Sequence, residues 1–285
     1  MRKIEFSKYN GQGNDFIVID SVTRSIVLSQ IHIKSLCDRH FGIGADGLIL
    51  LKTSEKADFF MDFYNRDGSK AEMCGNGIRC LAGFIFKKGL SRQHNLSIDT
   101  PAGKRIVDMS VNGNILGSIR ADMGRPVFSP KEIPVEMERD EAFNYKITID
   151  NRVFNINCLS MGNPHCVIFL GEDENLDTIP IGIWGPLIEK NRIFPHKTNV
   201  EFVKPSDANR IEMRVWERGV GETLACGTGA CAAGVYALKL GKVKGSQVNV
   251  KIPGGNLNVH WLSPSGSVFL EGTIEHVFDG VYYLG

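Results

Sequence analysis

The sequence lacks an excess of charge of either sign: its 33 lysines and arginines oppose 32 aspartates and glutamates, which leaves a net charge of +1. Proteins that bind nucleic acid usually carry a clear basic excess, so we expect no nucleic-acid partner. The sequence also lacks an apolar run of the about 18 residues that indicate a membrane-spanning helix. Its first residues contain no apolar core of a secretory signal. These absences predict a cytoplasmic protein without a membrane partner.

Cysteine is scarce and odd in number, with seven residues in a chain of 285. That is too few for a disulfide scaffold, and it favours a reducing compartment. The cysteines do not form the C-x2-C pairs that are typical of zinc sites. No glycine-rich stretch ends in the Gly-Lys-Ser/Thr of a phosphate-binding loop. The sequence therefore predicts neither a metal nor a cofactor.

What the sequence does contain is an internal repeat. Met61–Gly103 aligns with Met213–Gly255 at a constant offset of 152, and nine of these 43 aligned positions are identical. Most of the identities are cysteine, glycine or proline, residues that depend strongly on backbone geometry. We therefore expect two homologous halves, residues 1–130 and residues 145–285, joined by the proline-rich segment Arg125–Val135.

Weaker similarities extend the repeat toward the start of each half. Gly47–Leu50 matches Asn199–Phe202 at the same offset of 152, and Gly13-Asn14 matches Gly162-Asn163 at an offset of 149. The repeat thus includes loops and strands as well as the glycine turns that occur in both halves. This supports the prediction of two halves with the same fold.

Clusters of β-branched and aromatic residues predict mainly strands, with one long helix in each half. The long helices are expected at Cys74–Lys88 and Cys226–Leu240, each followed by a glycine, and a shorter helix at Ser29–Arg39. The predicted strands are Ile4–Ser7, Phe16–Asp20, Leu48–Leu51, Phe59–Tyr64, Leu96–Asp99, Ile115–Arg120, Val153–Cys158, Val167–Leu170, Val200–Val203, Ile211–Trp216, Val248–Ile252 and Val268–Leu270. This pattern predicts a mixed α+β fold.

The candidate chemistry concentrates where each long helix is expected to begin. Cys74–Gly77 and Cys226–Gly229 both read Cys-Gly-x-Gly. Free N–H groups and the helix dipole at such a start can hold a carboxylate or a phosphate. The same field favours the thiolate form and predicts a lowered thiol pKa. Each half therefore offers an anion site with an ionisable thiol beside it.

Two such thiols on opposite sides of one carbon could invert its configuration. One thiolate would remove the α-proton, and the opposite thiol would donate a proton to the other face. The helix N–H groups would stabilise the carbanion-like intermediate through its carboxylate. We therefore predict that Cys74 and Cys226 are catalytic. The other cysteines are expected to be small buried apolar residues: Cys37, Cys80, Cys158, Cys166 and Cys231.

Polar residues near the repeated motifs are candidates for substrate binding. Asn65 and Glu217 both lie nine residues before the cysteine of their half, and each is followed by an arginine. His165 could tune the pKa of a nearby thiol, although a structural, hydrogen-bonded histidine fits the sequence almost as well. Three loop asparagines could bind substrate or could equally stabilise turns: Asn14, Asn163 and Asn199.

Six ordered motifs resemble those of the diaminopimelate epimerases, and the similarity runs from Phe6 to about Gly280. The motifs are Gly11–Phe16, Asn65–Ser69, Met73–Cys80, Ser160–Cys166, Trp216–Thr223 and Ala225–Cys231. The resemblance implies a cofactor-independent epimerase that interconverts L,L- and meso-2,6-diaminopimelate, on the route to lysine and peptidoglycan precursors. It also implies two pseudo-symmetric halves, each a β-barrel-like sheet around a central helix, with the active site in the cleft between them. Such enzymes often form homodimers.

The resemblance also implies roles for individual residues. Cys74 and Cys226 would be the base and the acid, and Glu217 and His165 would contact the substrate amine or tune the thiols. The reacting carboxylate would be held by Gly75, Asn76, Gly227 and Thr228. The other polar groups of the substrate would be bound by Asn14, Asn65, Asn163, Asn199 and Arg218. Some family members carry a substrate-contacting glutamine where this chain has Gly47, so we expect no contact there.

Two other functions fit the sequence. Proline and hydroxyproline racemases also use two cysteines, and the Cys-Gly-x-Gly pattern alone does not exclude them. A diamino diacid, however, needs a second polar pocket, which Arg218 and four asparagines can supply. A non-enzymatic redox protein with a disulfide between Cys74 and Cys226 would need no stereospecific site.

Overall fold

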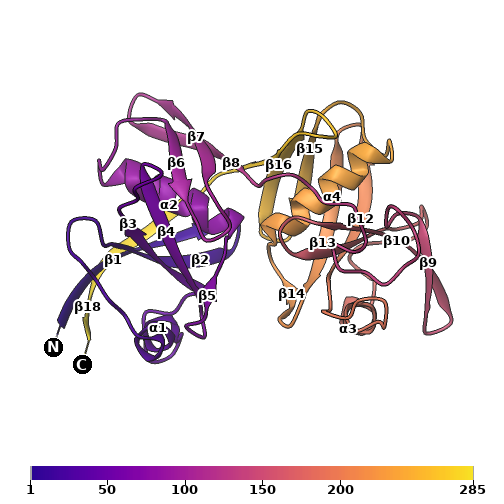
Figure 1. The fold of residues 1–285 in the computed structure, drawn as a ribbon, viewed down its shortest axis with the longest axis horizontal. Coiled ribbons are helices and arrows are strands. Elements are labelled where there is room, and N and C mark those ends of the chain that lie inside the picture. Colours follow the sequence, from indigo (N-terminus) through magenta and orange to yellow (C-terminus); the bar gives the residue numbers. More distant parts are fainter. Residues whose placement is uncertain (1, 285) are drawn as a thin grey trace. The chain divides into compact units, whose positions relative to one another are not determined.

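The computed structural model describes residues 2–284, which form a mixed α+β fold dominated by strands (Figure 1). The helices are α1 (Gln30–Cys37), α2 (Gly75–Lys87), α3 (Ile181–Glu189) and α4 (Gly227–Lys239). The strands that precede α3 are β1 (Arg2–Gly11), β2 (Asn14–Asp20), β3 (Gly47–Lys52), β4 (Phe59–Asn65), β5 (Lys70–Ala71), β6 (Asn95–Asp99), β7 (Arg105–Asn112), β8 (Ile115–Asp122), β9 (Tyr145–Ile149), β10 (Arg152–Ser160) and β11 (Pro164–Phe169). The later strands are β12 (Asn199–Asp207), β13 (Arg210–Glu217), β14 (Gly221–Thr223), β15 (Gln247–Ile252), β16 (Gly255–Trp261), β17 (Val268–Gly272) and β18 (Glu275–Leu284).

The chain divides into two compact units, each built from the same series of elements. Unit 1 contains the residues up to Asp122 together with those from Glu271 onward, and unit 2 contains Met123–Leu270. The series β1, β2, α1, β3, β4, β5, α2, β6, β7, β8 recurs in the same order as β10, β11, α3, β12, β13, β14, α4, β15, β16, β17. The internal repeat found in the sequence is therefore a repeat of structure, and the predicted α+β class is confirmed.

Strand pairing follows the repeat. β2 pairs in parallel with β3, and β11 pairs in parallel with β12. This register places Phe16 opposite Gly47 in unit 1 and His165 opposite Asn199 in unit 2. β4 pairs in parallel with β6, and β13 with β15, so that the central helix of each unit lies in the crossover between two parallel strands.

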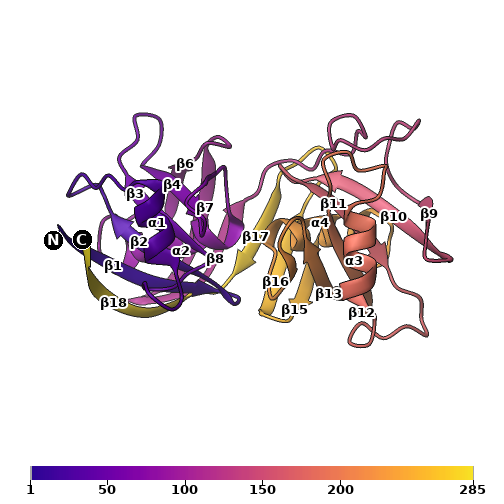
Figure 2. The same cartoon turned by 90° about the horizontal axis from the view of Figure 1, so that it is seen from below.

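The central helices α2 and α4 are buried along almost their whole length. α2 packs against β1, β2, β3, β7, β8 and β18, and α4 packs against β10, β11, β12, β13, β15 and β16 (Figures 1 and 2). A helix that is apolar on all sides belongs in the middle of a core. Each unit is thus a sheet wrapped around its helix, as predicted.

Glycine lets one strand pair approach α4 very closely. A Cβ atom on Gly234 would lie 2.9 Å from side-chain atoms of both Val248 and Val259. We expect Gly234→Ala to destabilise the protein by about 1–3 kcal/mol, because the added methyl group has to displace both valines. Urea unfolding measures this loss. Gly182→Ala in α3 is the matched control, since nothing lies within 4 Å of a Cβ at that position; an equal loss in both variants would contradict the packing argument.

The C-terminal strand departs from the predicted halves. β18 pairs antiparallel with β1, so the described residues from Glu271 onward belong to unit 1, whereas the sequence placed them in the half 145–285. β18 covers one edge of β1 just as β9 covers one edge of β10. An uncovered edge would leave backbone N–H and C=O groups unpaired, which explains why the chain returns. Unit 2 also begins earlier than expected, at Met123 rather than at residue 145.

The elements predicted from the sequence are present, with ends shifted by up to four residues. Helix α3 was not predicted, because it contains two glycines and Pro186, which are poor helix formers. Its Trp184 packs edge-on against Phe154 and lies beside Phe202, so tertiary packing stabilises this helix. None of the helices between residues 2 and 284 is long and apolar enough to cross a membrane.

Candidate active site

Both predicted catalytic cysteines cap a central helix. Cys74 precedes α2 and Cys226 precedes α4, each in extended backbone conformation, with φ of -142° and -126°. Each Sγ atom accepts a hydrogen bond from the N–H group three residues on, Gly77 in α2 and Gly229 in α4, at 3.4 Å in both units. Each sulfur therefore lies at the positive end of a helix dipole, where negative charge is stabilised.

Two asparagine side chains lie beside Cys74. Its Sγ donates to Asn14 Oδ1 at 3.8 Å, and Nδ2 of Asn76 donates to the same oxygen at 3.5 Å. Asn14 is fixed because its own Nδ2 donates to Asp46 Oδ2 at 2.9 Å. Asn76 is buried, whereas Cys74 and Asn14 are partly exposed. The structure thus brings together three of the site residues predicted in the first half, and Gly75 lies between two of them in the chain.

A buried arginine that the sequence analysis missed orients this group. Arg79 has no exposed surface, and its guanidinium donates to Gly75 O at 3.1 Å and to Asn76 Oδ1 at 2.9 Å. It also donates to Gln12 Oε1. These bonds hold the oxygen of Asn76 toward Arg79, so its NH2 group points to Asn14. A signal was available, because an arginine inside an otherwise apolar helix needs buried partners.

Cys226 lies in a different electrostatic setting. Burial, together with the negative charges of Glu217 and Glu201, raises the pKa of its thiol well above the ordinary value. Hydrogen bonds with Thr228, whose Oγ1 is 3.5 Å from the sulfur, and from Gly229 N–H oppose this effect without reversing it. The lowered thiol pKa that the sequence predicted is therefore wrong for Cys226, because desolvation outweighs the helix dipole.

Glu217 lies next to this thiol. Burial raises the pKa of its carboxyl group, and hydrogen bonds from the Thr223 hydroxyl and the Cys226 thiol partly oppose that effect. Thr223 is on β14, which pairs with the strand that carries Glu217. A carboxyl group that is shifted by burial and hydrogen-bonded to a thiol is well placed for proton transfer.

The raised pKa of Glu217 has a consequence for stability. The folded protein binds this proton more tightly than the unfolded chain does, so stability falls as the pH rises above the ordinary value of 4.5. Glu217→Gln has no such proton and should lose less stability than the unaltered protein over that range. Urea unfolding between about pH 4 and pH 7 checks this. Identical pH dependence in the two proteins would show that the carboxyl group is not shifted.

Two further buried residues complete the surroundings of Cys226. His165 Nδ1 is 2.7 Å from Glu201 Oε1, and its Nε2 is 2.9 Å from Asn163 Oδ1. Neither His165 nor Glu201 has exposed surface. Glu201 was not predicted as a site residue, although a glutamate inside the apolar run Val200–Val203 is a signal of a buried, paired carboxylate.

The remaining predicted binding residues differ in exposure. Asn65 is exposed and donates to Ser69 Oγ at 3.0 Å. Asn199 is buried, its Nδ2 donates to Pro164 O, and its Oδ1 accepts from the backbone N–H of Arg218, both at 2.9 Å. The side chain of Asn199 thereby links the first residue of β11 to the residue that follows β13, which is a structural role of the kind that the sequence left open.

Arg218 is exposed, and its Nη1 donates to His196 O at 3.2 Å. The nearby carboxylate of Glu222 pairs instead with Arg214, at 2.7 Å. The Arg218 guanidinium therefore keeps most of its donors available for a ligand.

Gly47 leaves no room for a larger residue. A Cβ atom there would lie 2.6 Å from the Phe63 ring and 2.8 Å from Tyr64 O. A glutamine at this position would therefore require β3 or β4 to shift.

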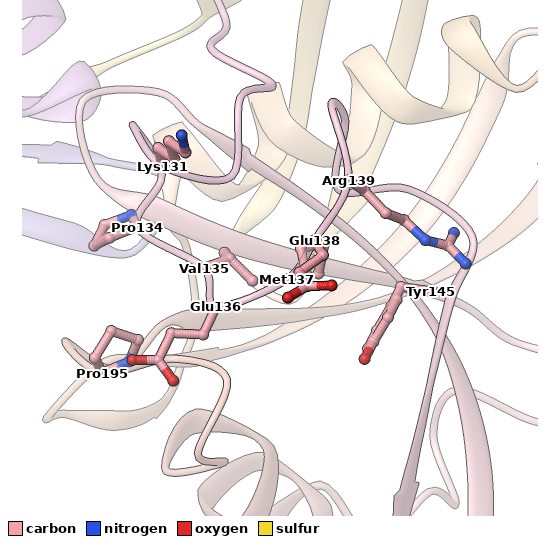
Figure 3. Close-up of a pocket in the computed structure, with 9 residues that line it drawn as sticks. All are labelled: Lys131, Pro134, Val135, Glu136, Met137, Glu138, Arg139, Tyr145 and Pro195. Carbon is pink, nitrogen blue, oxygen red and sulfur yellow. The ribbon is translucent and has the colours of Figure 1, made fainter.

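Figure 3 shows a pocket of about 810 Å3 in unit 2. Its walls come from the segment around Pro134–Arg139, from Tyr145 at the start of β9, and from Lys131 and Pro195. None of the predicted site residues lines it, so this pocket is not part of the candidate active site. Among residues 2–284, no group of three or more His, Cys, Asp or Glu side chains is arranged to hold a metal ion.

Comparison with known proteins gives full-length relatives. The family model described as diaminopimelate epimerase matches residues 6–129 and 157–277. The chain is 46% identical over 283 residues to the diaminopimelate epimerase of Halothermothrix orenii, covering 98% of this chain and 97% of that protein. It is 42% identical over 277 residues to the diaminopimelate epimerase of Methanococcus maripaludis, covering 97% and 99% of the two chains.

Solved structures with the same fold are more distant in sequence. A PhzF-family phenazine biosynthesis protein of Bacillus anthracis matches with a TM-score of 0.71 at 17% identity, covering 100% of both chains. A hydroxyproline epimerase of Agrobacterium vitis matches with a TM-score of 0.69 at 12% identity, covering 98% of this chain and 92% of that one. These likenesses establish the fold.

Proposed function

This chain belongs to the diaminopimelate epimerase family, and we propose that it interconverts L,L- and meso-2,6-diaminopimelate without a cofactor. It is an isomerase that acts on a small molecule, and we place it in the biosynthesis of lysine and peptidoglycan precursors. The observation that carries the proposal is the pair of capping thiols, Cys74 and Cys226, each at the start of a buried helix. Inversion at a carbon needs one acid/base group for each face, and the repeat supplies two.

In the proposed mechanism one cysteine acts as base and the other as acid on a single α-carbon. A thiolate takes the α-proton, the electron pair is delocalised into the carboxylate, and the opposite thiol returns a proton from the other face. The two cysteines exchange roles when the reaction runs in reverse. The raised pKa of the Cys226 thiol suits the member of the pair that holds its proton at rest.

The helix starts would stabilise the charge that develops in this step. Free N–H groups at a helix N-terminus bind anions, and donors aimed at the developing charge are often the largest catalytic contribution. We propose that the reacting carboxylate is held at these starts by Gly75, Asn76, Gly227 and Thr228. The buried Arg79, which fixes the side chain of Asn76, supports a preorganised site in unit 1.

The substrate also has a second amine and a second carboxylate. We propose that these groups are bound by Asn14, Asn65, Asn163, Asn199 and Arg218, and that Glu217 and His165 contact the amine or tune the thiols. The exposed guanidinium of Arg218, which has no carboxylate partner among residues 2–284, supports a role in holding the distal carboxylate. A planar guanidinium can hold a carboxylate through two parallel hydrogen bonds.

We further propose that the protein is a cytoplasmic homodimer with neither a nucleic-acid nor a membrane partner. Support for the dimer comes from β18, where four large apolar side chains are exposed to solvent: Val277, Phe278, Val281 and Tyr283. Contiguous exposed apolar surface often marks a protein–protein interface. Light scattering during size-exclusion chromatography tests this, and a particle with the 31.5 kDa mass of one chain would contradict it.

The decisive experiment is incubation with L,L-diaminopimelate in heavy water without added cofactor. We expect formation of the meso isomer with one deuterium at the inverted α-carbon. L-Proline and trans-4-hydroxy-L-proline are the comparison substrates, and inversion of either one in place of diaminopimelate would assign the chain to the racemases. No deuterium exchange into any of the three would favour the non-enzymatic redox alternative.

A further inference from the structure

Equivalent positions in the two units carry side chains of different charge beside the two thiols. By the repeat, Phe16 on β2 corresponds to His165 on β11, Ile49 on β3 to Glu201 on β12, and Asn65 on β4 to Glu217 on β13. In unit 1 these three residues are uncharged, whereas in unit 2 all three can ionise. At these three equivalent positions the two units therefore differ in the charge that their side chains can carry.

Ile49 and Glu201 occupy the same place against the start of the central helix. A Cβ atom on Gly77 would lie 3.3 Å from Cδ1 of Ile49, and a Cβ atom on Gly229 would lie 2.8 Å from Oε1 of Glu201. The Gly229 Cβ would also lie 3.3 Å from Sγ of Cys226. A carboxylate in unit 2 thus replaces a methyl group in unit 1 at the helix start that the thiol caps.

The hydrogen bonds of His165 define its protonation. Nδ1 faces the carboxylate of Glu201 at 2.7 Å and Nε2 faces the amide oxygen of Asn163 at 2.9 Å. A carboxylate and an amide oxygen both accept hydrogen bonds, so both ring nitrogens have to donate, which only the imidazolium form can do. The other carboxylate oxygen, Oε2 of Glu201, has no hydrogen-bond partner within residues 2–284. An imidazolium at His165 would place a positive group in direct contact with this buried carboxylate.

We propose that Glu201 is a positioning residue whose carboxylate holds His165 as a buried imidazolium beside Glu217 and Cys226. A lone buried carboxylate is very costly, whereas a hydrogen-bonded ion pair is tolerated. The pair adds no net charge to the unit 2 site. The two members act in opposite directions on Glu217: the His165 charge lowers the pKa of that carboxyl group and the Glu201 charge raises it. The Glu201 charge also raises the pKa of the Cys226 thiol. The consequence for catalysis rests on the proposed function of the two thiols.

The other groups around the pair are few. Glu217 on β13 and Cys226 at the start of α4 lie within electrostatic reach of Glu201. Cys166 on β11 also lies within its reach, and there burial, the Cys158 thiol and the Glu201 charge all raise the thiol pKa. Removal of the Glu201 charge should therefore act on Glu217 and Cys226 directly as well as through His165, whose ring it contacts.

The direct test is nitrogen-15 NMR of the histidine side chains in the full-length protein. We expect both ring nitrogens of His165 to be protonated near neutral pH, and Glu201→Gln to convert the ring to the neutral Nε2–H form. His165→Phe, which carries the residue found at the equivalent unit 1 position, assigns the signals. Glu212→Gln is the charge-matched control, because Glu212 pairs with Lys251, and it should leave the spectrum unchanged. A neutral His165 in the unaltered protein, or an imidazolium that persists in Glu201→Gln, would overturn the proposal.

Kinetics test the role in the reaction. We expect Glu201→Gln to lower kcat by about tenfold or more, to leave KM nearly unchanged and to shift the pH profile, whereas Glu201→Asp should recover much of the activity. A changed His165 spectrum with unchanged kcat and pH profile would overturn the positioning role. The NMR result does not require turnover, so an unaltered protein that fails to epimerise diaminopimelate would reject the proposed function while the spectrum still decides the state of His165.

Discussion

Replacement of either Cys74 or Cys226 by alanine should abolish epimerisation in both directions. Each face of the α-carbon is served by one thiol, so loss of one sulfur removes the base for one isomer and the acid for the other. General acid–base catalysis contributes about 10²- to 10⁴-fold to a rate. We expect kcat to fall by about a thousandfold or more, toward the upper end of that range. Chiral chromatography of reactions started from L,L- and from meso-diaminopimelate measures both directions.

Matched controls exist inside the same helices. Cys80→Ala in α2 and Cys231→Ala in α4 make the same substitution at buried positions away from the cap, and they should retain activity. The two capping variants lose a helix cap, which costs about 1 kcal/mol, so circular dichroism should show a folded protein. Near-normal turnover by either capping variant in both directions would rule out the two-thiol mechanism.

The features that the sequence predicted best are local in the chain. The helices α2 and α4 were expected within one residue of their observed starts, because a Cys-Gly-x-Gly turn, an apolar helix and a terminal glycine follow one another directly. The same segments carry Cys74 and Cys226, so the position of each candidate thiol at a helix start could be predicted together with its helix.

The features that escaped prediction depend on contacts between distant parts of the chain. β18 belongs to unit 1 because it pairs with β1, which lies at the other end of the sequence. A local sequence pattern does not predict such a pairing. Helix α3 depends on Trp184 packing against β-strand residues. In the sequence, Arg79 and Glu201 are recognisable only as charged residues inside apolar runs. The structure shows that their partners are Asn76 and His165.

Electrostatics explains the one chemical expectation that failed. A helix start lowers a thiol pKa when the sulfur remains in contact with solvent. The sequence does not show whether a given sulfur will be buried. Cys226 is 6% exposed and has two carboxylates nearby, so its thiol form is favoured despite the helix dipole. The side-chain amides of Asn14 and Asn76 lie beside Cys74. Two helices with the same cap thus provide different settings for proton transfer.

Arg218→Lys should raise KM steeply and also lower kcat. A lysine cannot reproduce the two parallel hydrogen bonds of a guanidinium to a carboxylate, and remote binding energy helps to orient the α-carbon between the thiols. Loss of one contact in a hydrogen-bonded charge pair costs roughly 2–5 kcal/mol. That loss corresponds to a decrease of about 30-fold to several thousandfold in kcat/KM.

The control for this variant is Arg214→Lys. Arg214 lies on β13, which ends one residue before Arg218. Its guanidinium already donates to Glu222 at 2.7 Å and to Leu176 O at 2.8 Å, so Arg214→Lys should change kcat/KM little. Within residues 2–284 the Arg218 guanidinium has the His196 carbonyl oxygen as its one hydrogen-bond partner, at 3.2 Å, so its substitution removes few contacts in the absence of substrate. A change of less than about fivefold in kcat/KM for Arg218→Lys would show that this residue does not hold the distal carboxylate, and would favour a substrate that lacks one.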